Sequence, residues 1–232
     1  MARSNMARNM AHDLRDSLAA DRTQALAWLP VSREIAERLD RFVALLLERQ
    51  AVMNLIAPST IPQVWTRHVA DSLQLLNIAP QAKRWIDLGS GAGFPGLVIA
   101  AALSGEAGAA VHLVESTGKK AAFLREAADA MDAPVTVHVM RIEDFAPNFR
   151  ESADVVTARA LAPLDKLLGL AAPLLKTGAE GLFLKGQDVD AELTLASKYW
   201  NIDADLIPSK TNPQSRIVRV RGAKPKSARR TF

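Results

Sequence analysis

The sequence of 232 residues predicts an α/β fold: a doubly wound, mostly parallel sheet of seven strands with one antiparallel strand, preceded by a helical extension. Three features indicate this class. Apolar residues recur at helical spacing before residue 80, whereas short apolar runs alternate with helical periods after Pro80. The first of these runs leads into a turn with four glycines. With 49% hydrophobic and 23% charged residues, the chain can bury a substantial core.

Two amphipathic helices are expected before the sheet. The first spans residues 31–50, begins after Ser32 as N-cap, and places five apolar side chains on one face: Ile35, Leu39, Phe42, Val43 and Leu46. The second spans residues 62–76, starts with a proline in its first turn, and presents Trp65, Val69, Leu73 and Leu76. We therefore expect residues 1–80 to form a helical region that packs on the core.

The sheet is expected within residues 81–222. Five apolar runs that alternate with helical segments are the candidates for parallel strands: RWIDL, VHLVE, VTVHVM, DVVTARA and GLFLK. Two further candidates, residues 204–207 and 216–220, flank the turn-rich segment PSKTNPQS and would form a hairpin that supplies the antiparallel strand. This alternation of strands and helices predicts a Rossmann-like domain.

The positive charge of the chain is concentrated near its C-terminal end. Seven basic residues and no acidic residue lie between Arg216 and Arg230, although the net charge of the whole chain is only +4. Gly222 and Pro225 disfavour regular structure, so we expect residues 223–232 to form a basic tail. Such a tail would either neutralise phosphates or aid solubility as a solvated segment, and both interpretations stay open.

The composition excludes several classes of protein. The chain has no cysteine, which excludes structural disulfides, thiolate zinc sites and cysteine nucleophiles, and we expect no metal. No apolar segment follows the basic N-terminus, as it would in a signal peptide. The longest apolar run, residues 97–103, is far shorter than the roughly 18 residues of a membrane helix. We expect a soluble, cytoplasmic protein that is a monomer.

The glycine-rich turn after the first strand predicts a cofactor site. Gly91, Gly93 and the residues up to Gly96 satisfy the G-x-G-x-x-G pattern, which suits either a nicotinamide dinucleotide or S-adenosylmethionine. Asp87 lies two residues before Gly89, where a carboxylate suits the ammonium and sulfonium groups of S-adenosylmethionine better than a pyrophosphate. The charge pattern therefore favours the methyl donor.

The next two strands end in residues that suit an adenosyl group. Glu115 follows Gly93 by 22 residues and can accept hydrogen bonds from both ribose hydroxyls, although nicotinamide enzymes use the same device. Ile142 can lie against an adenine ring, while residues 142–144 read its amino group. Structural roles are the alternatives: Asp87 as a cap of the following turn, Glu115 paired with Lys119, and Ile142 as ordinary core. The order of the residues favours the adenosyl cofactor.

Seven segments together resemble the bacterial 16S ribosomal RNA guanine-N7 methyltransferases, also called the glucose-inhibited division protein B family. They extend from about residue 53 to residue 185 and read NLIAPS, RHVADSL, IDLGSGAGFPG, VHLVESTGKKAAFL, RIED, TARALAPL and FLKG. The resemblance implies a Rossmann-like class I fold that uses S-adenosylmethionine. It also implies cofactor contacts at Gly89, Phe94, Ile142, Glu143 and Arg159. Residues 1–30 and the basic tail lie outside the resemblance.

The resemblance implies methyl transfer to N7 of a guanine in 16S rRNA, guanine 527 in the family, with free rRNA or a small-subunit particle as partner. Guanine N7 carries a lone pair and no proton, so an in-line displacement needs no general base and we expect no catalytic side chain. Methylation at pyrimidine C5 would need a cysteine nucleophile, and the chain has no cysteine. Exocyclic amino methylation usually uses a D/N-P-P-Y/F segment, which is absent at residues 157–163. Ribose methylation stays open because Lys185 could activate a hydroxyl.

Contacts with RNA are expected from Arg67, His68 and Lys185. The structural alternative for His68 is packing within a helical region, and that for Lys185 is simply to end a strand. Arg159 has two interpretations, a clamp on the cofactor or a partner of phosphate. Two other functions remain as alternatives: an NAD-dependent oxidoreductase, and a non-catalytic RNA-binding factor in ribosome assembly.

Overall fold

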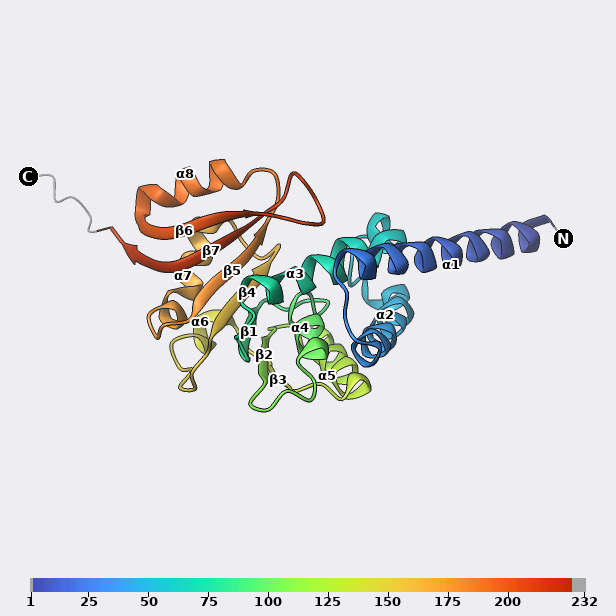
Figure 1. Ribbon diagram of the computed structural model, residues 1–232, viewed down its shortest axis with the longest axis horizontal. Helices are drawn as coiled ribbons and strands as arrows, with labels where there is room; N and C mark the ends of the chain where they lie inside the picture. The colour runs from blue at the N-terminus through green and yellow to red at the C-terminus, as the bar shows by residue number, and fades with distance from the viewer. Residues whose placement is uncertain (1, 227–232) are drawn as a thin grey trace, which may run out of the picture.

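A seven-stranded sheet forms the centre of the molecule in the computed structural model, which describes residues 2–226 (Figure 1). The strand order is β3-β2-β1-β4-β5-β7-β6. All neighbouring pairs are parallel except those of β7, which is antiparallel to both β5 and β6. The strands are β1 Arg84–Leu88, β2 Ala110–Val114, β3 Val135–His138, β4 Val155–Arg159, β5 Glu180–Lys185, β6 Trp200–Pro208 and β7 Arg216–Pro225. The predicted doubly wound sheet with one antiparallel strand is thus confirmed.

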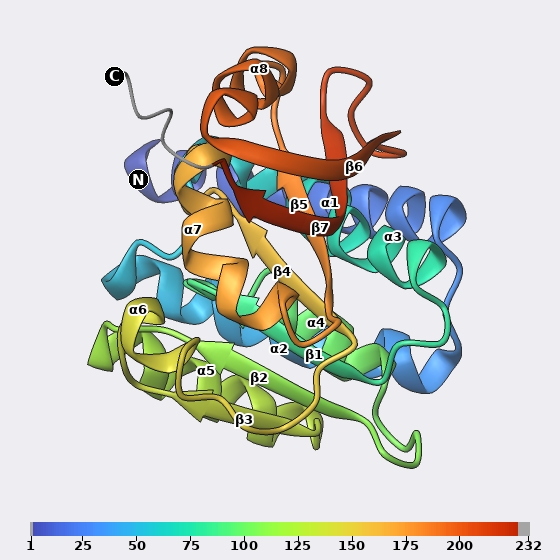
Figure 2. The ribbon, with the colours of Figure 1, turned by 90° about the vertical axis from the view of Figure 1, so that its left-hand side faces the viewer.

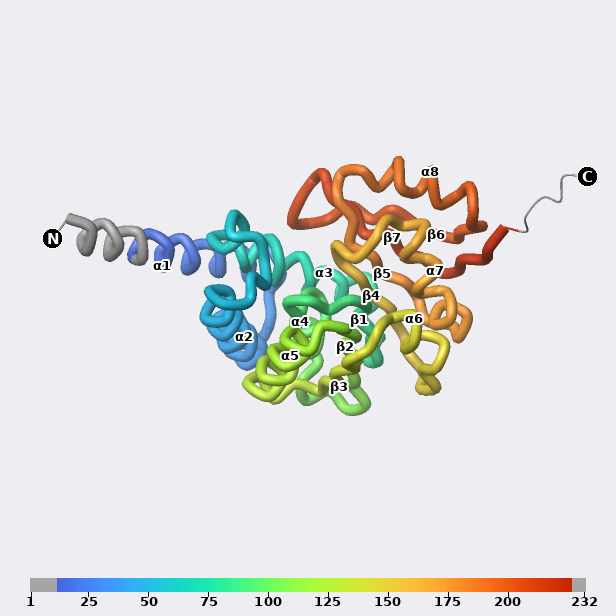
Figure 3. Tube along the Cα trace, turned by 180° about the vertical axis from the view of Figure 1, so that it is seen from behind, coloured from blue at the N-terminus to red at the C-terminus, as the bar shows by residue number. Residues whose placement is uncertain are grey.

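Helices cover both faces of the sheet (Figure 2). They are α1 Ala2–Trp28, α2 Arg33–Met53, α3 Asp71–Ile78, α4 Gly96–Ala102, α5 Gly118–Met131, α6 Ile142–Phe145, α7 Leu164–Leu175 and α8 Val189–Tyr199, with a 3-10 helix η1 Pro58–Gln63 and a π-helix η2 Trp65–Ala70. Helix α2 lies beside α5, which joins the N-terminal region to one face of the sheet (Figure 3). None of the helices in residues 2–226 is long and apolar enough to cross a membrane.

Two separate cores result from the alternation of side chains along the strands. Trp85 of β1 packs with the apolar sides of α2, α4 and α5, whereas its neighbours Ile86 and Leu88 pack with α6 and α7 on the other face. All three side chains are almost completely buried. Because every strand except β3 contributes to both cores, the carboxyl ends of the strands are held in fixed positions at one edge.

The expected helix 62–76 is replaced by η1, η2 and α3. The N–H groups of Trp65 and Thr66 donate to the buried carboxylate of Asp21, at 2.7 and 3.3 Å, rather than continuing a regular helix from Pro62. Asp21 lies 44 residues earlier in the chain than Trp65, so no local pattern could indicate this contact. The expected helix over residues 31–50 is confirmed, and Ser32 accepts a hydrogen bond from the N–H of Ile35.

The basic segment near the C-terminal end is more regular than expected. Strand β7 continues to Pro225, three residues beyond the expected boundary at 222; residues 216–220 pair with both β5 and β6, and the rest of the strand pairs with β6 alone. Arg219 forms an ion pair with Glu180, and Arg221 pairs with acidic residues of β6, Asp203 and Asp205. The expectation that Gly222 and Pro225 prevent regular structure was therefore wrong, because pairing with β6 outweighs their local preferences. Residues 227–232 of the expected tail lie outside the described chain.

Candidate functional site

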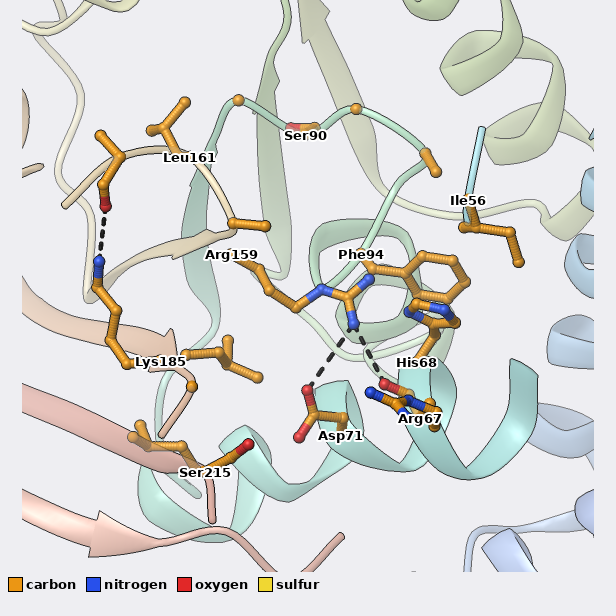
Figure 4. Close-up of a pocket in the computed structure, with 18 of the residues that line it drawn as sticks. Ile56, Arg67, His68, Asp71, Ser90, Phe94, Arg159, Leu161, Lys185 and Ser215 are labelled. Carbon is orange, nitrogen blue, oxygen red and sulfur yellow. Dashed lines mark hydrogen bonds and ion pairs between the residues drawn. The ribbon is translucent and has the colours of Figure 1, made fainter. Parts of the chain in front are cut away.

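A cavity of about 1520 Å³ lies at the carboxyl ends of the parallel strands, the usual place for ligands in this class of fold. The glycine loop forms one wall, the helical N-terminal region forms another, and the β6–β7 loop closes a third side (Figure 4). Ten of the twelve predicted binding residues line it: Arg67, His68, Gly89, Gly91, Phe94, Glu115, Ile142, Glu143, Arg159 and Lys185. The other two, Asp87 and Gly93, support the loop from outside the cavity wall.

The loop between β1 and α4 requires glycine because its backbone is left-handed. Gly89, Gly91 and Gly93 have φ angles of +70°, +53° and +93°. A Cβ atom on Gly89 would lie 2.6 Å from Cδ1 of Leu161, and one on Gly93 would lie 2.4 Å from Cδ1 of Leu97. These glycines therefore allow the backbone of residues 89–93 to form a wall of the cavity.

Asp87 supports the loop and does not face the cavity. Its carboxylate accepts hydrogen bonds from the N–H of Gly96, at 3.2 Å, and from the hydroxyl of Thr157, at 3.1 Å. Burial raises the pKa of this carboxyl to about 6, although the hydrogen bonds oppose the shift. The alternative in which Asp87 caps the following turn is therefore observed, since its carboxylate accepts the N–H of Gly96 in the first turn of α4.

Glu115 connects the end of β2 to the glycine loop. Its carboxylate accepts hydrogen bonds from the N–H of Gly91, at 3.0 Å, and from the N–H of Thr117, at 2.8 Å. Within the described residues it forms no ion pair with Lys119, so that alternative is not observed. The side chain lies in the cavity wall, where its remaining lone pairs can accept hydroxyl groups.

Ile142 and Glu143 begin α6 at the third strand end. Ile142 is 92% buried: it belongs to the second core and also lines the cavity, so its structural and binding interpretations are compatible. Glu143 is exposed at the same edge. Together with the acid after β2, these residues give the cavity one acidic and one apolar patch at neighbouring strand ends.

Arg159 extends from the end of β4 over the ring of Phe94, with its guanidinium carbon 5.1 Å from the ring centroid (Figure 4). One guanidinium nitrogen donates to the carbonyl oxygen of Arg67, at 3.2 Å, and lies 3.8 Å from Oδ2 of Asp71. Burial lowers the pKa of Arg159 and raises the pKa of Asp71, and the opposite charge of each partner counteracts both shifts. The position of Arg159 is thus fixed by an aromatic ring, a carbonyl and a carboxylate.

Asp71 connects two distant parts of the cavity wall. Its Oδ1 accepts hydrogen bonds from the side chains of Gln74, at 2.7 Å, and Thr211, at 2.8 Å. Gln74 in turn accepts the N–H of Lys210, at 2.9 Å, so α3 holds the β6–β7 loop in place. Asp71 lies in the RHVADSL segment, but its partners in the β6–β7 loop, Ser209 and Thr211, lie 138 and 140 residues away.

His68 packs flat against the ring of Phe94, with centroids 5.0 Å apart. Its Nε2 lies 3.0 Å from the hydroxyl of Thr60, while its buried Nδ1 has no hydrogen-bond partner among the described residues. Burial, followed by the nearby charges of Arg159 and Arg67, lowers the pKa of His68 to about 3. The imidazole is therefore neutral at physiological pH, and any contact that it makes with RNA is not ionic.

The pKa of His68 predicts how stability depends on pH. The unfolded chain binds a proton at His68 below pH 6.5, whereas the folded chain does not until about pH 3, so stability decreases as pH falls through this window. The unfolding free energy of the wild type relative to His68→Gln should fall by about 2 to 3 kcal/mol from pH 7 to pH 4. Urea titrations of both proteins at each pH measure it. A difference that stays constant with pH would contradict the assignment.

Lys185 is largely engaged within the protein. Its ammonium donates to the carbonyl of Ala162, at 2.6 Å, and forms an ion pair of 2.7 Å with Glu192. The carboxylate of Glu192 also accepts the N–H of Leu164, so the contacts of Lys185 and Glu192 connect β5, α7 and α8. These contacts favour a structural role for Lys185 at the end of its strand over a role as a free contact for phosphate.

The residues present fit an adenosyl cofactor. Gly91 offers an open cradle, since a Cβ placed there would meet only the carbonyl oxygen of Gly89, at 3.7 Å. The adjacent carboxylate of Glu115 and the apolar side chain of Ile142 are the acceptor and the packing surface that an adenosine requires. Four further cations line the cavity without an ion-pair partner among the described residues: Arg67, Lys120, Arg141 and Arg216. A cationic rim of this kind suits a polyanion as second substrate.

The strand order and the position of the cavity are those of the class I S-adenosylmethionine-dependent methyltransferase fold. Antiparallel β7 between β5 and β6 separates it from dinucleotide-binding sheets of order 3-2-1-4-5-6. Residues 35–218 match the family described as rRNA small subunit methyltransferase G, and the chain belongs to this family. Ribosomal RNA small subunit methyltransferase G from Bradyrhizobium sp. (strain ORS 278) is 58% identical over 89% of this chain and 93% of that protein. The corresponding protein of Rhodopseudomonas palustris (strain BisB18) is 56% identical over 90% of this chain and 89% of its own length.

Solved structures agree on the fold. An O-methyltransferase from Bacillus cereus in complex with SAH has a TM-score of 0.57 and 15% identity over 89% of this chain and 99% of that one. A putative O-methyltransferase from Klebsiella pneumoniae also has a TM-score of 0.57, with 13% identity over 90% of this chain and 99% of its own. At such low identity these similarities show the fold alone.

Proposed function

We propose that the protein transfers the methyl group of S-adenosylmethionine to N7 of a guanine in 16S rRNA, in the cytoplasm. The observation that carries this proposal is that one cavity contains both an adenosine-type cradle and cations that have no ion-pair partner among the described residues. The family of the chain supports rRNA as the substrate. The resemblance described above adds the guanine N7 position.

The chain would hold the cofactor through residues of three strand ends. The backbone of residues 89–94 and Glu115 would bind the polar groups, Ile142 would pack against the adenine, and Glu143 would lie beside it. The bound cofactor supplies a methyl group activated by its sulfonium. The Phe94 ring, with Arg159 and His68 against it, forms the adjacent wall and restricts water.

The side chains around the cavity suit an acceptor that loses no proton. His68 is neutral but its Nδ1 is buried, and Asp87 is enclosed behind the loop. The ammonium of Lys185 is paired with Glu192, which disfavours a role in activating a ribose hydroxyl. Guanine N7 needs only alignment with the methyl carbon and sulfur, because its lone pair carries no proton.

The test is methyl transfer to defined RNA substrates. The protein is incubated with labelled S-adenosylmethionine and either 16S rRNA or small-subunit particles from a strain that lacks the corresponding methyltransferase. Cleavage of the RNA with borohydride and aniline then maps 7-methylguanine. We expect label at one guanine of 16S rRNA in at least one substrate. Absence of label, with the cofactor bound, would overturn the proposal.

Gly89→Leu separates catalysis from a purely structural role in ribosome assembly. The substituted side chain would meet Leu161 and force a left-handed backbone on leucine, so we expect loss of cofactor binding and of methyl transfer. Calorimetry with S-adenosylhomocysteine and the RNA assay measure both. If 16S rRNA methylation persisted, the loop would not hold the donor. If the protein acted only as a non-catalytic assembly factor, Gly89→Leu would still support ribosome assembly in cells as well as the wild type does.

A further inference from the structure

Trp28 is a large aromatic side chain that is exposed inside the cavity. It lies at the last residue of α1, lines the cavity wall and is 42% exposed. Among the described residues, no hydrogen bond involves its indole N–H. Tryptophan is highly buried on average, so an indole that is 42% exposed leaves apolar ring surface open to a ligand. An open indole face directed at a binding cavity therefore calls for a ligand.

The helix end that carries Trp28 is fixed to the body of the protein. The carboxylate of Asp21 accepts the N–H of Trp65, at 2.7 Å, and the hydroxyl of Thr66, at 2.6 Å. Ala25, one turn later on the same helix face, and Leu29, directly after the end of the helix, are only 1% and 4% exposed. Trp28 thus protrudes from an anchored helix, and its position is defined without a ligand.

The surroundings of the indole suit a nucleotide. On this wall, the residues from α1, η1 and η2 that line the cavity include the neutral amides of Gln24 and Gln63 and the unpaired cation of Arg67, and they include no carboxylate. Nucleobases stack on aromatic rings, amides pair with base edges, and arginine binds phosphate. An acidic peptide would use the cation but leave the indole and the amides without a role.

The cavity is larger than one cofactor requires. Its volume of about 1520 Å³ exceeds the roughly 300 to 1,000 Å³ of ordinary small-molecule sites. Helix η2, against which α1 packs, places His68 on the ring of Phe94, so the wall of Trp28 is continuous with the wall of the cofactor loop. A nucleotide next to the target base would thus reach the indole while the target lies near the loop.

We propose that Trp28 is a stacking platform for an unpaired nucleotide of the rRNA substrate, flanking the target guanine, with Gln24 and Gln63 at its edge and Arg67 at its phosphate. The inference rests on the proposed function, because it takes rRNA as the occupant of the cavity. Residue 28 lies outside the segment 35–218 that matches the family, so the platform is a feature of this chain's N-terminal helix.

The test compares Trp28→Ala, Trp28→Phe and a matched control, Tyr199→Ala. Tyr199 is an aromatic residue that is 59% exposed on α8 and does not line the cavity. We expect Trp28→Ala to raise the KM for 16S rRNA about 10-fold with kcat and S-adenosylhomocysteine affinity unchanged. Trp28→Phe should restore most of the KM, and Tyr199→Ala should match the wild type. An unchanged KM in Trp28→Ala, or an equal loss in kcat and cofactor affinity, would overturn the proposal.

A binding measurement separates this inference from the proposed activity. Fluorescence polarisation with a labelled single-stranded oligonucleotide of 16S sequence needs no methyl transfer. We expect about 10-fold weaker binding by Trp28→Ala than by the wild type. Equal affinities would overturn the stacking role even if methylation is found, whereas a loss of affinity would support it even if methylation is not. A defect seen only with ribosomal particles and not with free RNA would assign the indole to a protein partner and contradict the proposal.

Discussion

Replacing Glu115 with alanine is expected to weaken the binding of S-adenosylhomocysteine about 100-fold or more. The carboxylate accepts the N–H groups of Gly91 and Thr117, so its loss leaves two donors of the loop region without their partner. It also removes the acceptor expected for the ribose hydroxyls. Each hydrogen bond to a charged group contributes about 1.5 to 3 kcal/mol, so the loss of the two hydrogen bonds from the ribose hydroxyls accounts for the expected loss of affinity.

Isothermal titration calorimetry measures this effect directly. Glu106→Ala is the matched control, because Glu106 is exposed in the loop before β2 and does not line the cavity. Glu106→Ala should bind S-adenosylhomocysteine with wild-type affinity. Neither the wild type nor Glu106→Ala should bind NAD. A wild-type dissociation constant for Glu115→Ala would show that the acid after β2 is no part of the cofactor site.

Gly96→Ala is expected to lower the free energy of unfolding by about 3 kcal/mol. A Cβ atom at this position would lie 2.3 Å from Cδ2 of Leu113 and 2.8 Å from Oδ2 of Asp87, and both of those side chains are almost completely buried. The new methyl group would also disturb the hydrogen bond from the N–H of residue 96 to Asp87. Because this contact fixes the start of α4, cofactor affinity should decrease as well.

Gly118→Ala is the control for this substitution. Gly118 also begins a helix that follows a parallel strand, but a Cβ atom there would meet nothing within 4 Å. Urea unfolding of the two variants should therefore show a large loss for Gly96→Ala and no loss for Gly118→Ala. Equal stabilities would mean that the packing between β1, β2 and α4 is looser than the geometry indicates.

The sheet and most of the cavity could be predicted because their signals are local. Apolar runs, the glycines at 89, 91 and 93, and the acid at the end of the second strand each depend on neighbouring residues. The carboxyl ends of parallel strands meet at one edge, which brings Glu115, Ile142 and Arg159 together without knowledge of long-range contacts.

The orientation of individual side chains could not be predicted in the same way. Asp87 faces the start of α4 because the N–H of Gly96 donates to one oxygen of its carboxylate and the hydroxyl of Thr157 to the other, and Thr157 lies 70 residues away. Asp71 and Trp28 acquire their roles from the β6–β7 loop and from the anchoring of α1 by Asp21. Except for the contact between Gly96 and Asp87, these contacts join segments that are far apart in the sequence, and no periodicity predicts them.

A crystal structure with S-adenosylhomocysteine tests the central claim most directly. The adenosine should lie in the cavity, with its ribose hydroxyls within hydrogen-bond distance of Glu115 and its adenine against Ile142. The sulfur should be directed toward the space beside Phe94 and Arg159. A ligand bound at another surface, or an adenine on the wall formed by α1 and η2, would contradict this description of the site.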